Sequence, residues 1–462
     1  MSQNLKHKRR SILDLYVNSP KSFGRFIMAL KNLINSDDWG RICGIHGNTF
    51  NPNDKNVKCP TDPTEVTKIG ETGEPFYCKH SVYSFIAWHA PYIYEFELLL
   101  NKHDKSKKRE YITLPWLDLT DFDSDYGFIN DPEITIYYES QLITTENPLS
   151  GAYYYVNGVR TRTQRNGFLT PRNNKQYTQL STVKKQLNDA LHALTYEEFS
   201  SAANKTVEQT PLETPHNSLH DIIGGKNGNM SSIDISAFDP LFWLHHCNMD
   251  RHYYSWYANI TNHFTAPLYP TYITEETMNE HCAPFFDSDI FNTDCTTYTY
   301  GWQNCTGRYA KVSDIIDITK FPYTYDIITP TEKSVSNYYI TIRDVFVPPE
   351  SVEINVYMYP KDGELDTNTH FMGSSFWFGI NQKKISCARC KSAKIQFNID
   401  ITDFVLRHQI SQLNKDQYNI AIEVIGQHST TNKKYNKQEF LGLGNVSICL
   451  PDGSSELEFS WL

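Results

Sequence analysis

The sequence contains no long hydrophobic run. Apolar residues make up 39% of its 462 residues, yet no run approaches the roughly 18–20 residues that a membrane-spanning helix needs. The N-terminal stretch MSQNLKHKRRSILDLYVNSP is basic and has no apolar segment behind it, so it does not predict a secretory signal. From these absences we expect a soluble, intracellular protein that does not bind a membrane.

Basic charge and cysteine are also scarce. The net charge is −10, and the one basic run, KHKRR at residues 6–10, is short and terminal. A nucleic-acid partner is therefore not expected. Ten cysteines are too few for a disulfide-built scaffold of this length. Aromatic residues, in contrast, are abundant, with 30 Tyr and 25 Phe, which predicts a folded protein with a large core.

Two parts of the chain differ in their hydrophobic pattern. Up to about residue 325, apolar residues recur with helical spacing, as in the segments 22–34 and 85–100. Further on, apolar and polar residues alternate in short segments such as SVEINVYMY and YNIAIEVIG, which is typical of a β-sandwich. We therefore predict a largely helical domain at 1–325, a polar linker at 326–336 and an antiparallel β-sandwich at 337–462.

Two neighbouring segments carry histidines at a spacing that suits a metal ion. His216 and His220, in TPHNSLHDIIGG, are four residues apart, so on a helix both rings face one side. Such a pair is also common on an exposed face or in a satisfied core. The run AFDPLFWLHHCNMDR then adds the adjacent His245 and His246. A third ligand from this run would complete a three-imidazole site.

A second set of histidines, His46, His80 and His89, lies upstream. Residues nine apart fall on opposite faces of a helix. His80 and His89 therefore meet only if His80 lies on a loop that precedes the helix of His89. The segment KIGETGEPFYCKH, with its two glycines and its proline, favours such a loop.

The donor type restricts the metal. All-imidazole coordination suits copper, zinc, iron or nickel and disfavours Mg²⁺ and Ca²⁺. A single site of three histidines would suggest hydrolytic zinc. Two such sites on one helical core favour a pair of copper ions that share dioxygen.

At these residues the sequence resembles the type-3 copper family, which comprises tyrosinases, catechol oxidases and molluscan haemocyanins. HSVYSFIAWHAPYIYEFE resembles the first copper signature of the family, and DPLFWLHHCNMD resembles the second. GIHG, YCKH and AFDPLFWLHHCN are most similar to fungal tyrosinases. The resemblance covers most of residues 10–325. It implies a mainly α catalytic domain, a four-helix bundle that holds a dicopper centre, followed by an antiparallel β-sandwich domain.

The resemblance also implies the ligands of two copper ions. The first ion would be held by His46, His80 and His89, and the second by His216, His220 and His246. The implied activity is that of a tyrosinase, which uses O₂ to hydroxylate monophenols and to oxidise o-diphenols to o-quinones. O₂ and small phenols would be its partners. A catechol oxidase without monophenol activity and a haemocyanin-like O₂-binding protein remain as alternatives.

The helical spacing around His246 predicts roles for its neighbours in the sequence. Phe242 precedes His246 by four residues, so its ring shares the helix face of His246 and would wall the copper pocket. Asp250 follows by four and could orient His246. His245 turns toward Leu241 and is expected either to pack in the core or to support a copper ligand without binding the ion itself.

Three further residues acquire roles only through the resemblance. Cys78 stands where fungal enzymes and molluscan haemocyanins form a thioether, here to His80; a free structural cysteine is the alternative. Glu213 and Asn217, on either side of His216, would hold a water that deprotonates a monophenol. Alternatively, Glu213 favours a helix N-terminus and Asn217 faces solvent.

The C-terminal domain of fungal members keeps the enzyme latent, with one residue that plugs the entrance to the copper site. Phe376 or Phe378 is the candidate plug here. Cys387 and Cys390, in CARC, resemble a pair suggested to relay copper. A disulfide or a buried thiol pair is the alternative.

Two other positions bear on how the catalytic domain is held together. Tyr323 and Tyr325 resemble the tyrosine motif that ends this domain in the family, and we expect them to pack against Arg9 or Arg10. Ala90 stands where the family usually has an arginine, which predicts altered support of the neighbouring ligand without loss of copper.

Overall fold

The computed structural model describes most of the chain and divides it into two compact units. The described segments are residues 6–47, 77–107, 110–156, 159–168, 173–201, 210–263, 273–288, 290–291, 308–329, 338–346, 348, 350–379, 394–407, 417–427, 434–436, 446–450, 453–456 and 460–462. The first unit comprises Met1–Gln164, Gln186–His216 and Asp234–Glu332, and the second comprises Arg165–Lys185, Asn217–Ile233 and Lys333–Leu462. The Cys387–Cys390 pair lies outside the described residues. The division at 1–325, 326–336 and 337–462 stays a prediction.

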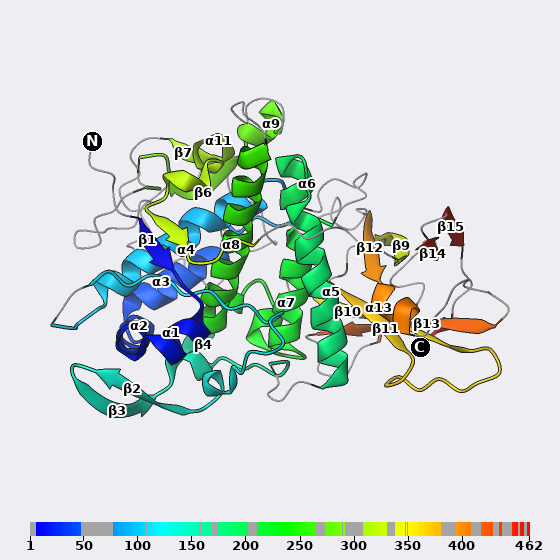
Figure 1. Cartoon of the computed structure of the whole chain (residues 1–462), viewed down its shortest axis with the longest axis horizontal. Helices are drawn as coiled ribbons and strands as arrows, with labels where there is room; N and C mark the ends of the chain where they lie inside the picture. The colour runs from blue at the N-terminus through cyan, green and yellow to red at the C-terminus, as the bar shows by residue number, and fades with distance from the viewer. Residues whose placement is uncertain are drawn as a thin grey trace. The chain divides into compact units, whose positions relative to one another are not determined.

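The first unit is built mainly from helices (Figure 1). These are α1 (Ile12–Asn18), α2 (Pro20–Ile34), α3 (Asp37–His46), α4 (Phe85–Lys102), α6 (Tyr196–Ser200), α8 (Pro240–His263), α9 (Glu275–Met278) and α11 (Val312–Ile315). Two more helices, α5 (Asn174–Leu191) and α7 (Glu213–Gly224), contribute residues to both units. The helices predicted at 22–34 and 85–100 are confirmed as α2 and α4.

The local sequence explains why α2 and α4 form and why α4 is central. Pro20 occupies the first turn of α2, where its missing N–H has no helical partner to lose. Every residue of α4 from Phe85 to Leu100 is buried, as expected of a helix that is apolar on all sides. α4 packs against α8 (Figure 1), and the rings of Phe96 and Trp243 stack at 3.9 Å between these two helices.

Short strand pairs and 3₁₀ turns complete the first unit. The strands are β1 (His7–Arg9), β2 (Glu133–Tyr138), β3 (Gln141–Glu146), β4 (Tyr153–Val156), β5 (Val159–Arg162), β6 (His281–Phe286), β7 (Tyr309–Lys311) and β8 (Tyr323–Tyr325). The 3₁₀ turns are η1 (Gly127–Ile129), η2 (Pro148–Ser150), η4 (Ser236–Phe238) and η5 (Ile318–Lys320). β1 pairs in parallel with β8, with Arg9 opposite Tyr325, so the two ends of the unit lie side by side.

The second unit contains two four-stranded sheets with a common core. One sheet has the order β11 (Phe371–Trp377), β10 (Val352–Pro360), β13 (Tyr418–Gly426) and β16 (Ser460–Trp461). The other has the order β12 (Lys394–Asp400), β9 (Tyr339–Phe346), β14 (Val446–Leu450) and β15 (Gly453–Glu456). Buried residues of both sheets, such as Ile342, Ile354 and Ile422, form one hydrophobic cluster. The short elements α13 (Thr402–Arg407) and η3 (Asn229–Ser231) also belong to this unit.

One strand pair departs from the predicted antiparallel pattern. The described pairs of the two sheets are antiparallel, except that β16 runs parallel to β13. Between β15 and β16 the chain passes from the edge of one sheet to the edge of the other. A strand that arrives by such a crossover is not bound to the antiparallel direction that a hairpin imposes.

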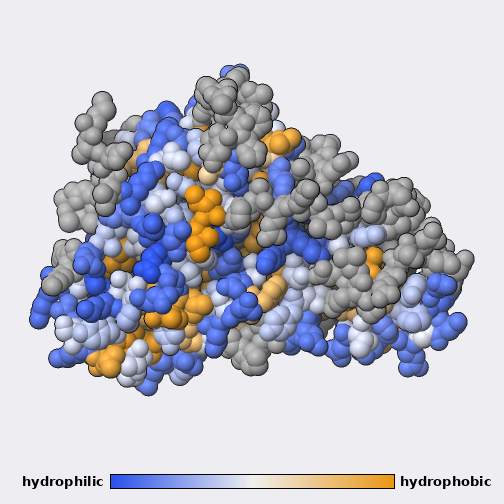
Figure 2. Space-filling view, in the orientation of Figure 1, coloured by the Kyte–Doolittle hydropathy of each residue, from blue (hydrophilic) through white to orange (hydrophobic). Residues whose placement is uncertain are grey.

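The described surface is largely polar. On the face shown in Figure 2, hydrophobic side chains occur in small groups among hydrophilic ones. Among the described helices, none combines the length and the apolar character that crossing a membrane requires.

A fully buried arginine links the two central helices to the ends of the first unit. Arg9 has no exposed surface, and its Nε donates to Oε2 of Glu97 in α4 at 2.8 Å. Its Nη1 lies 3.2 Å from Oδ2 of Asp250 in α8 and 3.0 Å from the Tyr325 hydroxyl. The guanidinium also lies 3.4 Å from the centre of the Tyr323 ring. The expected packing of the two tyrosines is thus confirmed for Arg9.

Asp250, which was predicted to orient His246, instead contacts Arg9 and Tyr325. The Tyr325 hydroxyl donates to Oδ2 of Asp250 at 2.5 Å, in addition to the Arg9 contact. Burial raises the pKa of Asp250 to about 6, although Arg9 opposes the shift. The carboxylate therefore serves the arginine cluster.

Replacing Arg9 with methionine should strongly destabilise the protein. The substitution leaves Glu97 and Asp250 buried without a cation, which typically costs about 3–5 kcal/mol. Chemical denaturation of the full chain measures the loss. Arg10→Met is the matched control because Arg10 is partly exposed and pairs with Asp14 within α1 and its cap, so its loss should cost about 0–1 kcal/mol. Equal losses in the two variants would contradict the assigned role of Arg9.

Candidate metal centre

The first histidine group combines residues from two helices and a loop. His46 ends α3, His80 lies in the loop that precedes α4, and His89 lies in the second turn of α4. Together with Cys78, they place one donor atom each within 4.8 Å of the others. The prediction that His80 precedes the helix of His89 is confirmed. A side chain at Gly47 would place its Cβ 2.2 Å from the carbonyl oxygen of Asp234, so only glycine fits directly after His46.

Two carboxylates hold the loop around His80. Ser81 has a positive φ of 56°, a conformation that residues other than glycine rarely adopt. Its backbone N–H donates to Oε1 of Glu213 at 2.7 Å. Three residues later, the backbone N–H of Ser84 donates to Oε2 of Glu280 at 2.8 Å. These hydrogen bonds fix the turn that directs His80 toward the other histidines.

The second histidine group lies on α7 and α8. His216, His220, His245 and His246 each offer a ligand atom, and these atoms lie within 4.8 Å of one another. The Nε2 atoms of His216 and His246 are only 3.3 Å apart. Two imidazole nitrogens at this distance can share a hydrogen bond or a metal ion, and in a group of four histidines such convergence is typical of a metal site.

Backbone carbonyls orient several of these rings. Nδ1 of His89 lies 2.7 Å from the carbonyl oxygen of Phe85, and Nδ1 of His220 lies 2.9 Å from that of Met230. A ring that donates its Nδ1–H to a carbonyl is left with an unprotonated Nε2. Each of these two imidazoles therefore presents a lone pair to its group, and this is the arrangement that metal-binding histidines commonly show.

Within the first unit, rings of the two groups lie beside one another. The rings of His89 and His246 stack with their centres 4.5 Å apart, and the rings of His80 and His216 lie 5.5 Å apart. Phe242 lies beside this junction, 4.1 Å from His246 and 4.6 Å from His46. Its predicted position beside His246 is therefore observed.

Burial favours the neutral form of His80 and His89. Desolvation lowers the pKa of His89 to about 3. Burial, together with the nearby His89 and His46, also holds the pKa of His80 well below its usual value. Only neutral imidazole binds a metal ion, so protons compete weakly for these ligands at neutral pH. The buried donors are imidazoles with one thiol, a set that fits copper and disfavours Mg²⁺ and Ca²⁺.

Of the two roles predicted for His245, the contacts favour support of a neighbouring histidine. Its ring stacks on His216 with centres 5.1 Å apart, and it makes a hydrogen bond to the backbone of His216. Burial nevertheless lowers the pKa of His245 to about 3. His245 is thus a neutral imidazole inside the second group that also ties α8 to the start of α7. Helical spacing alone did not show this, because the contact depends on how the two helices pack.

The remaining predicted site residues, Cys78, Glu213 and Asn217, lie close to the histidine groups. Sγ of Cys78 is buried, 3.0 Å from Nε2 of His46 and 3.3 Å from Nδ1 of His80. Besides Ser81, Glu213 accepts a hydrogen bond from the Ser201 hydroxyl at 2.5 Å. Asn217 is half-buried, one helical turn after Glu213. Glu280 was missed, and no motif in the sequence would have found it.

Comparison with known proteins agrees with this arrangement. The common central domain of tyrosinase matches residues 36–259, close to half of the chain. A tyrosinase of Neurospora crassa is 27% identical over 371 residues, which cover 66% of this chain and 53% of that protein. A tyrosinase of Podospora anserina is 26% identical over a match that covers 66% of this chain and 64% of that protein. A haemocyanin unit of Helix pomatia is 23% identical over a match that covers 69% of this chain and 65% of that protein. The match therefore spans about half to two thirds of these relatives.

Solved structures share the fold over nearly the whole chain. A recombinant mushroom tyrosinase superposes with a TM-score of 0.71 at 17% identity and covers 99% of both chains. The holo-protyrosinase of Aspergillus oryzae superposes with a TM-score of 0.70 at 16% identity and covers 100% of this chain and 97% of that one. Both histidine groups lie in or against helices of the matched central domain, and the resemblance noted in the sequence is confirmed. Residues 36–259 of this chain belong to the family of tyrosinase central domains.

Proposed function

We propose that the chain is a copper-dependent phenol oxidase of the tyrosinase type. The observation that carries the proposal is the pair of buried, neutral histidine groups that meet at the His89–His246 stack. His46, His80 and His89 would hold one copper ion, and His216, His220 and His246 would hold the other. When bound, the copper pair supplies the dioxygen binding and electron transfer that no side chain provides.

The overall reaction would convert a monophenol and O₂ into an o-quinone and water, and an o-diphenol into the same quinone. The protein would position the phenol, exclude water and manage protons. Phe242 gives the site an apolar wall for an aromatic ring. The buried Cys78 thiol lies 3.3 and 3.9 Å from the two ring nitrogens of His80. We propose that a thioether to the ring carbon between these nitrogens would fix His80. The S–H bond of Cys78 and the C–H bond of that carbon would be lost, and O₂, the oxidant of the proposed reaction, would take up the two electrons and two protons as H₂O₂.

Glu213 and Asn217 would handle the proton of a monophenol. Both carboxylate oxygens of Glu213 already accept a hydrogen bond, which suits a carboxylate held in one orientation. Each oxygen keeps a further lone pair. Through it Glu213, together with the Asn217 amide one turn further along, would orient a water that takes the phenol proton.

A haemocyanin-like O₂-binding protein is the second candidate. The similarity to a Helix pomatia haemocyanin unit favours it. Catalytic turnover separates the two candidates: sustained O₂ consumption with L-tyrosine or L-DOPA supports the enzyme, whereas reversible oxygenation without quinone formation supports the carrier. Activity on L-DOPA alone indicates a catechol oxidase.

The second unit would keep the enzyme latent through Phe378. The ring of Phe378 stacks on that of His220 at 4.1 Å, nearly parallel. Phe376, the other candidate plug, lines a separate pocket of the same unit. Phe378 thus covers one face of a proposed copper ligand, and this contact would restrict access of a phenol.

His246→Ala should remove one of the two copper ions. Its Nε2 converges on that of His216, so its loss leaves the second group with an incomplete ligand set, and the copper content should fall to about one ion per chain. Metal analysis after reconstitution measures the content. His245→Ala is the matched control and should keep most of the copper, with altered packing between α7 and α8. The assignment is reversed if His245→Ala loses an ion and His246→Ala keeps both.

Glu213→Gln should separate the two phenol activities. If the carboxylate takes the phenol proton, kcat for L-tyrosine should fall by about a hundredfold or more, while oxidation of L-DOPA falls far less. Steady-state kinetics of quinone formation measure both. Glu280→Gln is the control, because Glu280 also supports the loop at His80 through a backbone N–H but has no proposed role with the phenol. Equal losses for the two substrates in Glu213→Gln would show that Glu213 only holds the loop.

Phe378→Ala should activate the full chain. The substitution removes the ring that covers His220, so the rate of L-DOPA oxidation should rise severalfold without proteolysis. Phe376→Ala removes an equal ring two residues away and should leave that rate near the starting value. Similar rates in the two variants would argue against Phe378 as the plug.

A further inference from the structure

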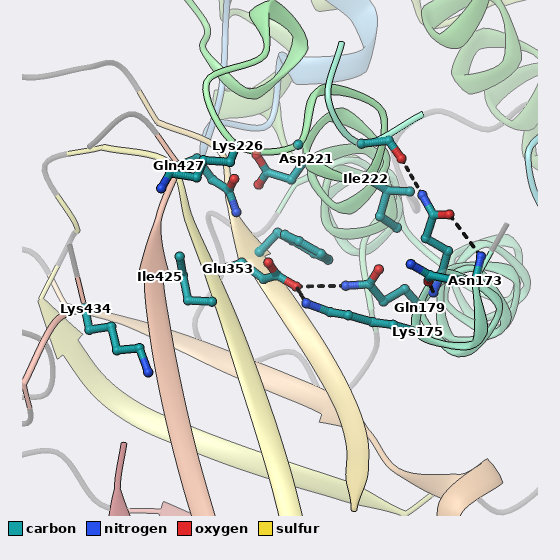
Figure 3. A pocket seen from close by; sticks show the side chains of 14 residues that line it. Asn173, Lys175, Gln179, Asp221, Ile222, Lys226, Glu353, Ile425, Gln427 and Lys434 are labelled. Atoms are coloured by element: carbon teal, nitrogen blue, oxygen red, sulfur yellow. Dashed lines mark hydrogen bonds and ion pairs between the residues drawn. The ribbon is translucent and has the colours of Figure 1, made fainter. Parts of the chain in front are cut away.

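The second unit contains a pocket that charged, amide and apolar side chains line and that no histidine lines. Its volume is about 370 Å³, which lies in the usual range for small-molecule sites. The walls come from the start of α5, the end of α7 and the strands β10, β11 and β13 (Figure 3). Three apolar side chains, Ile222, Phe376 and Ile425, line it together with charged and amide groups.

Asp221 is the unusual member of this lining. Asp221 is only 2% exposed, and both of its carboxylate oxygens are buried without a hydrogen-bond partner among the described residues. Burying a carboxylate in this way costs several kcal/mol unless something pairs with it. Such a group needs either a bound proton or a cationic ligand.

No neighbour supplies that positive charge. The nearby Ser231 hydroxyl donates to the carbonyl oxygen of Gly225 at 2.9 Å. Among the described residues, no lysine or arginine forms an ion pair or a hydrogen bond with the carboxylate of Asp221.

The other charges of the pocket are mostly neutralised. Glu353 accepts from Lys175 at 2.6 Å and from the Gln179 amide at 2.9 Å (Figure 3). Lys434 pairs with Glu423 at 2.9 Å. The half-buried Lys226 has no ion-pair partner in the part of the chain that the structure describes. The pocket therefore holds one unpaired carboxylate, Asp221, and one unpaired ammonium, Lys226.

We propose that this pocket binds a small zwitterion of the amino-acid class. The ammonium group of the ligand pairs with Asp221 and its carboxylate pairs with Lys226. The apolar part of the ligand packs against Ile222, Phe376 and Ile425. A simple cation would satisfy Asp221 but would meet the three lysines of the lining, and a simple anion would leave Asp221 without a partner. A zwitterion satisfies both unpaired charges, and the proposal depends neither on copper nor on phenol oxidation.

Calorimetric titration of the full chain with L-leucine tests the proposal. Leucine carries both charges and an apolar side chain, and it has no phenol ring, so it is no substrate of the proposed enzyme. We expect saturable binding at one site per chain. Isoamylamine, which lacks the carboxylate, and isocaproate, which lacks the ammonium group, should each bind about tenfold or more weakly, as expected for the loss of one charged pair. Absence of saturable leucine binding, or equal affinity for all three probes, overturns the proposal.

Two variants assign the subsites. Asp221→Asn should weaken leucine binding about tenfold or more and leave isocaproate binding unchanged, whereas Lys226→Met should weaken leucine binding and leave isoamylamine binding unchanged. Asp400→Asn removes another buried carboxylate of the same unit that does not line the pocket, and it should bind leucine as the parent does. Thermal unfolding shows whether each variant folds. If Asp221→Asn does not fold, Lys226→Met still tests the proposal, because Lys226 is only half-buried and its replacement should not prevent folding. Unchanged leucine binding in both pocket variants would contradict the assignment.

Discussion

The buried Arg9 guanidinium is the contact on which the histidine arrangement of the first unit depends. It bonds Glu97 of α4 and Asp250 of α8 at the same time. Glu97 lies eight residues after His89, and Asp250 lies four after His246, so the carboxylates and the histidines share the faces of their helices. The cluster thus fixes the axial position and the rotation of α4 relative to α8. A small shift at the arginine would separate the rings of His89 and His246.

Neutrality of the imidazoles is the second constraint on the site. The histidines lie so close together that protonated rings would repel one another. Burial favours the neutral form by lowering the pKa of His80, His89 and His245. Backbone carbonyls then select the tautomer, as Phe85 does for His89 and Met230 for His220. Burial and tautomer together leave lone pairs converging from α4, α7 and α8. The protein therefore contributes a fixed, uncharged set of donors, and a bound metal pair would keep its full positive charge.

The sequence predicted those features that follow from spacing along one element. The pair His216 and His220, the position of Phe242 beside His246, and the loop before His89 all follow from helical periodicity and from polar connecting segments. The hydrogen bond from His245 to the backbone of His216, and the hold of Glu280 on the loop at His80, depend on how separate elements pack. The parallel direction of β16 depends on where the chain crosses between sheets. Periodicity carries no information about such contacts, so the structure was needed to find them.

The end of α7 brings the proposed zwitterion pocket and a histidine of the second group together. His220 belongs to the second histidine group, whereas the next residue, Asp221, lines the pocket. Consecutive residues of a helix point about 100° apart, so one turn of α7 serves both. Phe376, near the end of β11, also lines the pocket, and Phe378, one residue beyond this strand, stacks on His220. An occupant of the pocket would contact α7 and β11 at residues next to the His220–Phe378 pair. Binding there is therefore placed to act on the ring that covers His220, because both contacts are built on the same two segments.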